Sequence, residues 1–307
     1  LAPGFDSLLL ARVGWGMMAA GIIPLAMAWI GDAVPYEERQ PTLARLLLGT
    51  LSGMMAGQLV GGLYAETDLG WRGAFATMAA GYGFIGVMLA LRLRTIAAAP
   101  VQAGGGMAGF GRQLRTVLGT PWSWRVLGAA LCEGMLLLGP MAFLPAYLHE
   151  RFGLSVAAAS GLIALYAVGG LVYAVFARRI VQSLGERRMV SAGGWLMGLG
   201  YLMWLLSPVV WTAGPVAVLV GFGTYLFHNT LQTHSTQMAP TARGTSVAMF
   251  AFCLFFGQAI GVSAAGYAFD HLGPVPLLLG PALLLPVVGL AFARALRRRA
   301  AAAGHVR

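Results

Sequence analysis

The segment at residues 225–240, YLFHNTLQTHSTQMAP, carries two histidines, an asparagine and two glutamines at the end of an apolar run. On a helix, His228, Gln232 and Ser235 share one face because they are spaced i, i+4 and i+7, and Asn229 starts a neighbouring stripe that two threonines continue. Amides and imidazoles in hydrocarbon cost free energy unless they meet partners or water. This arc predicts a cavity wall that contacts substrate, or alternatively a set of hydrogen bonds that fixes helix packing.

A second polar group at similar depth is Glu133, in the apolar run LCEGMLLLGP. Glu133 lies about four residues to the cytoplasmic side of the middle of its run and His228 about three, so at 1.5 Å per residue their depths agree within a few Å. A charge near the bilayer centre costs about 2.5–3.5 kcal/mol on insertion scales, which favours a functional role. We expect Glu133 to meet His228 across a cavity and to carry a coupling proton. The alternative is a carboxylate that reaches the membrane surface.

The elements that must hold these residues are membrane helices. Hydrophobic residues make up 58% of the 307 residues, charged residues 10%, and the mean hydropathy is +0.76, which is a membrane composition. Continuous apolar runs of about 19–24 residues cross the hydrocarbon as helices, and their lack of period-two alternation argues against a barrel. We predict an all-α, polytopic membrane protein with about nine spans, at residues 8–30, 46–64, 73–91, 126–148, 155–177, 189–207, 213–236, 246–268 and 274–293.

The orientation of these spans follows from arginine, the only basic residue type besides histidine. Most arginines fall in alternate loops, and the other set of loops holds only Arg72 and Arg151, so the positive-inside rule makes it the outer set. We expect a multi-pass protein of the cytoplasmic membrane with its C-terminus in the cytoplasm. A nucleic-acid partner, which the charge of +10 and the pI near 10.4 suggest, is disfavoured because the charge is spread over many loops.

Motifs for enzymatic chemistry are missing from the sequence. Without lysine, there is no P-loop lysine for nucleotide hydrolysis and no Schiff base for a cofactor. The stretch HERFG at His149 starts like a zinc protease motif but has Gly153 where the second histidine should stand, so no metal site is predicted. We expect no enzyme and no cofactor. The partners expected instead are the lipid bilayer, a small-molecule substrate and protons.

An internal repeat relates two parts of the chain at an offset of 204 positions, which carries Arg39 to Arg243. In both parts the arginine is followed by glycines about one helical turn apart. Glycines so spaced let two helix backbones approach closely. The glycines expected to pack helices in this way are Gly53, Gly57, Gly61, Gly257 and Gly261.

The repeat divides the chain into two bundles, at residues 1–94 and 123–307. Residues 95–122 between them are rich in Gly and Ala and are typical of a flexible cytoplasmic connector. Part of this connector, from Phe110 to Leu118, is a candidate for a short basic helix on the membrane surface.

Several segments resemble the major facilitator superfamily. The stretch LLLARVGWG, with Arg12 and Gly16, looks like the family's motif in its fourth helix, and WIGDAVPYEERQ (29–40) looks like the loop that follows. GWRGAF (70–75) is similar to the entry of the sixth helix, and FLPAYLHERFGLS (143–155) to the connection from the seventh helix to the eighth. LGERR (184–188) resembles the second-half counterpart of the family's conserved cytoplasmic loop.

The resemblance implies that the nine spans are the family's fourth to twelfth helices, and that the first three are missing from a truncated first half. It places the arc of residues 225–237 in the tenth helix, which lines the central cavity, and Arg12 near the proton path. Substrate contacts are then expected from His228, Asn229 and Gln232, and from Gln58, where the efflux branch has proline. The residues expected to form the cytoplasmic gate and its loops are Asp32, Glu38, Arg39, Gly185, Arg187, Arg188 and Arg243.

The function implied is secondary active transport by alternating access, as proton-coupled efflux of drugs or sugar-like metabolites. An uptake symporter of the same fold is one alternative. A membrane receptor or scaffold that transports nothing is the other.

Overall fold

The computed structural model describes residues 4–34, 36–93 and 106–304, and within these ranges every regular element is a helix. The prediction of an all-helical protein is confirmed. The α-helices are α1 (Phe5–Ala19), α2 (Ile22–Ala33), α3 (Tyr36–Ala65), α4 (Gly70–Leu93), α5 (Gly106–Leu118), α6 (Pro121–Glu133), α7 (Gly139–Met141), α8 (Leu144–Phe152), α9 (Val156–Ala164), α10 (Tyr166–Leu206), α11 (Ala213–Ser235), α12 (Arg243–His271) and α13 (Pro274–Gly304). Short helical turns at η1 (Gly134–Leu138), η2 (Val210–Thr212) and η3 (Pro240–Ala242) complete the set.

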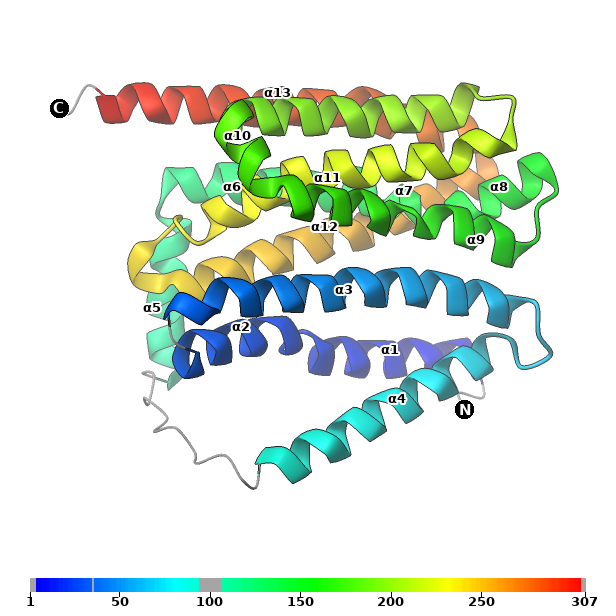
Figure 1. Cartoon of the computed structure of the whole chain (residues 1–307), viewed down its shortest axis with the longest axis horizontal. Helices are drawn as coiled ribbons and strands as arrows, with labels where there is room; N and C mark the ends of the chain where they lie inside the picture. The colour runs from blue at the N-terminus through cyan, green and yellow to red at the C-terminus, as the bar shows by residue number, and fades with distance from the viewer. Residues whose placement is uncertain (1–3, 35, 94–105, 305–307) are drawn as a thin grey trace.

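Six stretches of the described residues are long and apolar enough to cross a membrane. They are Gly70–Arg92, Pro121–Phe152, Val156–Leu206, Val210–Ser235, Pro240–His271 and Pro274–Ala302. The third of these holds two predicted spans, because Gly185 leaves the helical region with φ 68° and ψ 159° and the chain turns back there (Figure 1). Such a positive φ is readily adopted only by glycine.

The first two predicted spans, 8–30 and 46–64, are helical but are not among these six stretches. The first is divided into α1 and α2 by a turn at Ala20 and Gly21. Pro24 follows in α2, and proline has no N–H with which to continue the helical hydrogen bonds to Ala20. The second lies within α3, Tyr36–Ala65, whose 30 residues are long enough to cross a membrane.

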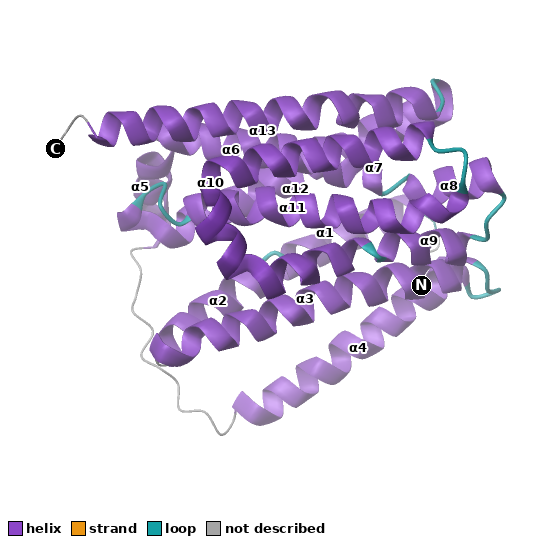
Figure 2. Ribbon diagram, turned by 45° about the horizontal axis from the view of Figure 1, so that its top comes forward, coloured by secondary structure: helices purple, strands orange, loops and turns teal. Residues whose placement is uncertain are grey.

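The main hydrophobic core belongs to helices α6 to α13, where it extends from Trp122 to Leu296. These helices form one bundle, with α1, α2 and α3 running beside it and α5 lying across one end (Figures 1 and 2). Helix α4 diverges from the others, and most of its apolar stretch Gly70–Arg92 is exposed. The part of the predicted connector that the structure describes is thus mostly α5, which packs on α6 and α12.

Glycine allows two helices of the bundle to touch backbone to backbone. A Cβ at Gly257 would overlap the carbonyl oxygen of Leu131, and one at Gly261 would overlap that of Met135. Gly257 and Gly261, which the spacing assigned to helix packing, therefore lie at a close contact between α12 and the α6–η1 segment.

The matching glycines of α3 behave differently. A Cβ at Gly53, Gly57 or Gly61 would meet no atom of the described residues within 4 Å. The predicted helix packing is therefore absent at these three positions within the described chain. The physical reason is that the face of α3 that carries these glycines is exposed, and no other described helix packs against it.

Helix α3 does pack on the bundle at another face. Gly62 lies so close to α9 that a Cβ there would come 2.7 Å from the Cβ of Ser160. Near this contact, the Glu66 carboxylate accepts a hydrogen bond of 2.7 Å from the backbone N–H of Ala157. This bond at the first turn of α9, together with Ser155, holds the pKa of Glu66 below its usual value of 4.5.

Candidate functional site

The centre of the candidate site is an ion pair between α6 and α11. His228 Nδ1 lies 3.1 and 3.2 Å from the two carboxylate oxygens of Glu133. The Glu133 side chain is 1% exposed and that of His228 is 23% exposed. The two residues expected at matched depth thus lie in contact, and the carboxyl group of Glu133 is buried against one titratable partner.

Local geometry around Glu133 explains how α6 presents it. The helix continues as the π-helical turn Gly134–Leu138, in which the N–H of Gly139 bonds back to the Gly134 carbonyl. Pro140 comes next and has no N–H for the Leu136 carbonyl, so ordinary α-helical bonding is interrupted here. Gly134 also lies against the Leu254 carbonyl of α12. Glu133 is thus held where the helix widens, a feature that is frequent at functional sites.

Most hydroxyl groups of the polar arc are used within α11 itself. Thr230, Thr233 and Ser235 each donate to a backbone carbonyl three or four residues earlier. Such bonding removes them as donors to a ligand. The hydroxyls of the arc are thus used inside α11, whereas the hydrogen bonds that join α11 to other helices come from Asn229 and the two histidines.

The amides of the arc differ from one another. Asn229 Nδ2 donates to the hydroxyl of Tyr173 in α10 at 2.7 Å, and Tyr173 is 2% exposed. Gln232 is half-buried and its side chain makes no hydrogen bond to another described residue. Gln232 is therefore a half-buried amide of the arc that is free to contact a ligand, whereas Asn229 is already fixed by a neighbour.

Two further residues predicted for the site lie elsewhere. Arg12 lies between α1 and α4, where its guanidinium stacks 4.7 Å from the ring of Phe75 in a cavity of about 570 Å³. Gln58 is exposed on α3 and makes no hydrogen bond to another described side chain. Neither contacts Glu133 or His228, so the ion pair is built entirely from the bundle of α6 to α13.

A second polar cluster closes the arginine-rich end of the bundle. After the turn at Gly185, Glu186 accepts a hydrogen bond of 3.1 Å from His234 of α11. This bond holds the pKa of Glu186 below its usual value of 4.5, even though burial opposes the shift. His234 is also 3.4 Å from Arg299 of α13, which stacks over the Trp122 ring. The cluster ties α6, α10, α11 and α13 together.

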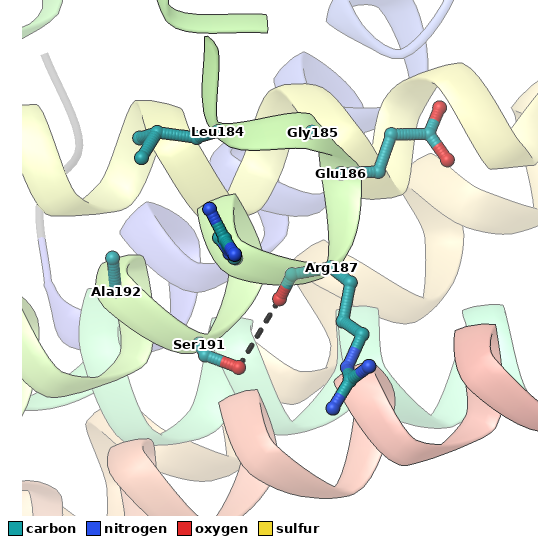
Figure 3. A pocket seen from close by; sticks show the side chains of 7 residues that line it. Leu184, Gly185, Glu186, Arg187, Ser191 and Ala192 are labelled. Atoms are coloured by element: carbon teal, nitrogen blue, oxygen red, sulfur yellow. Dashed lines mark hydrogen bonds between the residues drawn. The ribbon is translucent and has the colours of Figure 1, made fainter.

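Figure 3 shows this turn from close by. Glu186 and Arg187 leave the backbone in different directions, and Arg187 points towards the ribbon of α13. The Ser191 hydroxyl donates to the Arg187 carbonyl at 3.1 Å. Arg187, Arg188 and Arg243, predicted for the cytoplasmic gate, are exposed at this end.

The remaining predicted gate residues are Asp32, Glu38 and Arg39, whose side chains lie outside the described residues. Prediction from the sequence missed Tyr173, Glu186, Trp122 and Arg299 as partners. Of these four residues, only Glu186 lies in a motif that the sequence analysis had identified, LGERR (184–188). Among the described residues, no three side chains of the types His, Cys, Asp and Glu lie close enough together to hold a metal ion.

The sequence of the chain is similar to a known protein family and to several named proteins. The pattern of the family described as Major Facilitator Superfamily matches residues 1–262 and 152–306. The protein named "Probable transporter SCO4007" of Streptomyces coelicolor is 28% identical over 265 residues, which cover 83% of this chain and 59% of that protein. The chain therefore spans less than two thirds of that relative's length.

Two relatives from Bacillus subtilis are similar over more of their length. "Uncharacterized MFS-type transporter YceJ" is 22% identical over 278 residues, which cover 90% of this chain and 70% of that protein. "Uncharacterized MFS-type transporter YfhI" is 23% identical over 295 residues, which cover 94% and 71% respectively.

Proposed function

The chain belongs to the Major Facilitator Superfamily, and from this premise we propose that it is a secondary active transporter driven by protons that titrate the Glu133–His228 pair. Membership of a family of transporters also means that no enzymatic reaction is proposed. The observation that carries the proposal is the buried carboxylate of Glu133 at 3.1 Å from His228. An ionisable residue inside a membrane span is by default a functional group.

The ion pair supplies a chemical switch. With one proton between them, the two groups attract each other, either as imidazolium and carboxylate or as a hydrogen-bonded neutral pair. A second proton neutralises the acid while the histidine stays cationic, so the ion pair is lost. His228 is then released towards Gln232, its neighbour on the same face of α11, and the pair couples proton uptake to a change at the proposed substrate-contacting arc.

The proposed direction of transport and the proposed substrate class rest on the resemblance to the efflux branch of the family. We propose efflux of a drug-like or sugar-like compound in exchange for protons, with the arginine-rich end in the cytoplasm. Uptake by symport is the alternative of the same fold, and it uses the same ion pair. A receptor or scaffold does not require Glu133 to titrate.

The proposal is tested in membrane vesicles from cells that express the protein, loaded with a pH-reporting dye. Panels of amphipathic organic cations and of sugars are added, and proton movement that depends on a compound is recorded. Glu133→Gln keeps the shape of the side chain but cannot titrate, so we expect it to abolish this proton movement. Glu150→Gln, which changes an exposed carboxylate of α8, is the matched control and should leave it intact.

The outcomes separate the alternatives. Efflux by exchange and uptake by symport move protons in opposite directions relative to the compound. Proton movement that persists in Glu133→Gln would place the coupling site elsewhere, with Arg12 as the next residue to change. No compound-dependent proton movement with any member of either panel favours a receptor or scaffold.

A further inference from the structure

A groove of about 500 Å³ opens between α6 and α13, and its lining includes no residue of the Glu133–His228 pair and neither Glu186 nor His234. Helix α6 begins and α13 ends at the arginine-rich end of the bundle, so the two helices run in opposite directions along the groove. The walls of the groove therefore change in chemistry with depth. One zone is cationic and the other is apolar.

The cationic zone consists of Arg125 in the first turns of α6, and Arg294 and Arg298 near the end of α13. All three side chains are exposed and none forms an ion pair with a described acidic residue. No Asp or Glu lines the groove. Three uncompensated guanidinium groups therefore face one cavity, which favours a phosphate group because guanidinium binds phosphate through paired hydrogen bonds.

The apolar zone lies deeper in the predicted membrane. On α6 it is formed by Gly128, Ala129 and Cys132, and on α13 by Val287 and Ala291 among others. Val287 is 57% exposed, and a Cβ at Gly128 would meet no described atom within 4 Å. The floor is thus apolar and open to the hydrocarbon, which suits a chain of methylene groups.

The mouth of the groove carries an aromatic residue of the kind found at membrane surfaces. Trp124 is 61% exposed, and its Nε1–H donates to the Leu118 carbonyl at 2.8 Å, which fixes the ring at this level. Tryptophan is enriched where headgroups meet hydrocarbon. The boundary between the cationic and apolar zones is therefore at the depth of the lipid headgroups.

We propose that this groove binds one anionic phospholipid, with its phosphate against Arg125, Arg294 and Arg298 and one acyl chain along the floor. Basic pockets between membrane helices on the cytoplasmic side are the usual form of such sites. A free phosphate ion satisfies the arginines but leaves the apolar floor without an occupant, so the lipid fits the whole groove better. The bound lipid bridges α6 and α13 at the end where Trp122 and Arg299 also join them.

The test uses the purified protein in a neutral detergent, titrated with phosphatidylglycerol, phosphatidylcholine or inorganic phosphate. Bound lipid is counted by native mass spectrometry, and the midpoint of thermal unfolding is measured in parallel. We expect phosphatidylglycerol to bind and to raise the midpoint, and phosphatidylcholine and inorganic phosphate to have much smaller effects. Arg294→Gln with Arg298→Gln should weaken the phosphatidylglycerol affinity roughly 10- to 30-fold.

Two further variants keep this test specific. Arg178→Gln with Arg179→Gln removes the same charge from exposed positions of α10 outside the groove, and should leave lipid binding unchanged. Gly128→Leu fills the floor without a clash, so it should weaken phosphatidylglycerol binding while the protein stays folded.

Undiminished phosphatidylglycerol binding by Arg294→Gln with Arg298→Gln, or by Gly128→Leu, would overturn the proposal. Equal losses in the α10 control variant would show that net charge, not the groove, attracts the lipid. Stabilisation by inorganic phosphate equal to that by phosphatidylglycerol would instead assign the groove to a soluble anion.

Discussion

The side chains of α11 differ in how much of their hydrogen-bonding capacity remains free for a ligand. Hydroxyls are satisfied by the preceding turn of the helix, and Asn229 is held by Tyr173. Gln232 and His228 are the groups whose contacts change most readily, since one has no bonded neighbour among the described side chains and the other has a titratable one. The proposed binding chemistry rests on this difference.

This difference predicts two kinds of variant. Gln232→Ala should weaken binding of the transported compound by about 1–3 kcal/mol without changing thermal stability. Asn229→Ala should instead lower the free energy of unfolding by about 1–3 kcal/mol, because it leaves the buried Tyr173 hydroxyl without its donor. Compound binding and unfolding midpoints measured on the same preparations check both effects. Equal stability losses in the two variants would contradict the assignment.

Glu186 gives a prediction about pH. Its pKa is lowered in the folded protein by the His234 hydrogen bond, so its contribution to stability is fully present above about pH 4.5 and is lost as the pH falls through the lowered pKa. Because the side chain is 47% exposed, the effect is modest. The unfolding midpoint of Glu186→Gln should lie below that of the unsubstituted protein at pH 6, and the gap should close as the pH falls below about 4.5 and through the lowered pKa. A gap that widens with acidity would reverse this sign.

Among the elements, α12 and the α6–η1 segment are joined by a close backbone contact beside the site. Gly257 and Gly261 bring the two backbones together just beside Glu133, and Gly134 does the same from the other side. The geometry of the π-helical turn and the position of the carboxylate therefore depend on these glycines, because a larger side chain would overlap the facing backbone.

Substitution of these glycines should have opposite outcomes in the two repeats. Gly261→Leu must displace the backbone of Met135, and we expect a loss of about 1–3 kcal/mol or more in the free energy of unfolding. Gly57→Leu points into open space and should change it by no more than about 0.5 kcal/mol. Thermal unfolding in detergent measures both. Similar losses in the two variants would show that the α3 face is packed against something.

At the scale of the whole molecule, α3 and α9 form the main contact between the first helices and the bundle of α6 to α13. The contact combines the close approach of Gly62 to Ser160 with the Glu66 bond to Ala157. Alternating access moves one bundle of a transporter against the other. In the proposed mechanism this contact must therefore open during each cycle.

A disulfide across this contact tests the movement. Cysteines at Gly62 and Ser160 lie close enough to pair after a small backbone adjustment. In a background where Cys132 and Cys253 are replaced by serine, oxidation should stop compound-dependent proton movement, and a reductant should restore it. Each single-cysteine variant serves as control. Unchanged transport by a fully oxidised pair would mean that the two helices need not separate.

The sequence by itself determined the class of the protein and the approximate depth of its polar residues. Hydropathy, helix length and the distribution of arginine depend only on the order of residues along the chain. They predicted membrane helices and the matched depth of Glu133 and His228. The same one-dimensional reading found glycines at helical spacing. It did not show which of them, Gly57 or Gly261, has a neighbour.

Only the tertiary structure decided which groups meet. The pairs Glu133–His228, Asn229–Tyr173 and Glu186–His234 each join different helices, or segments far apart in sequence. Depth along a helix follows from residue number, but the rotation of each helix about its axis and the identity of the helix beside it depend on packing across the whole bundle. For this reason the sequence predicted the polar arc, whereas the groove between α6 and α13 became visible only when the helices were assembled.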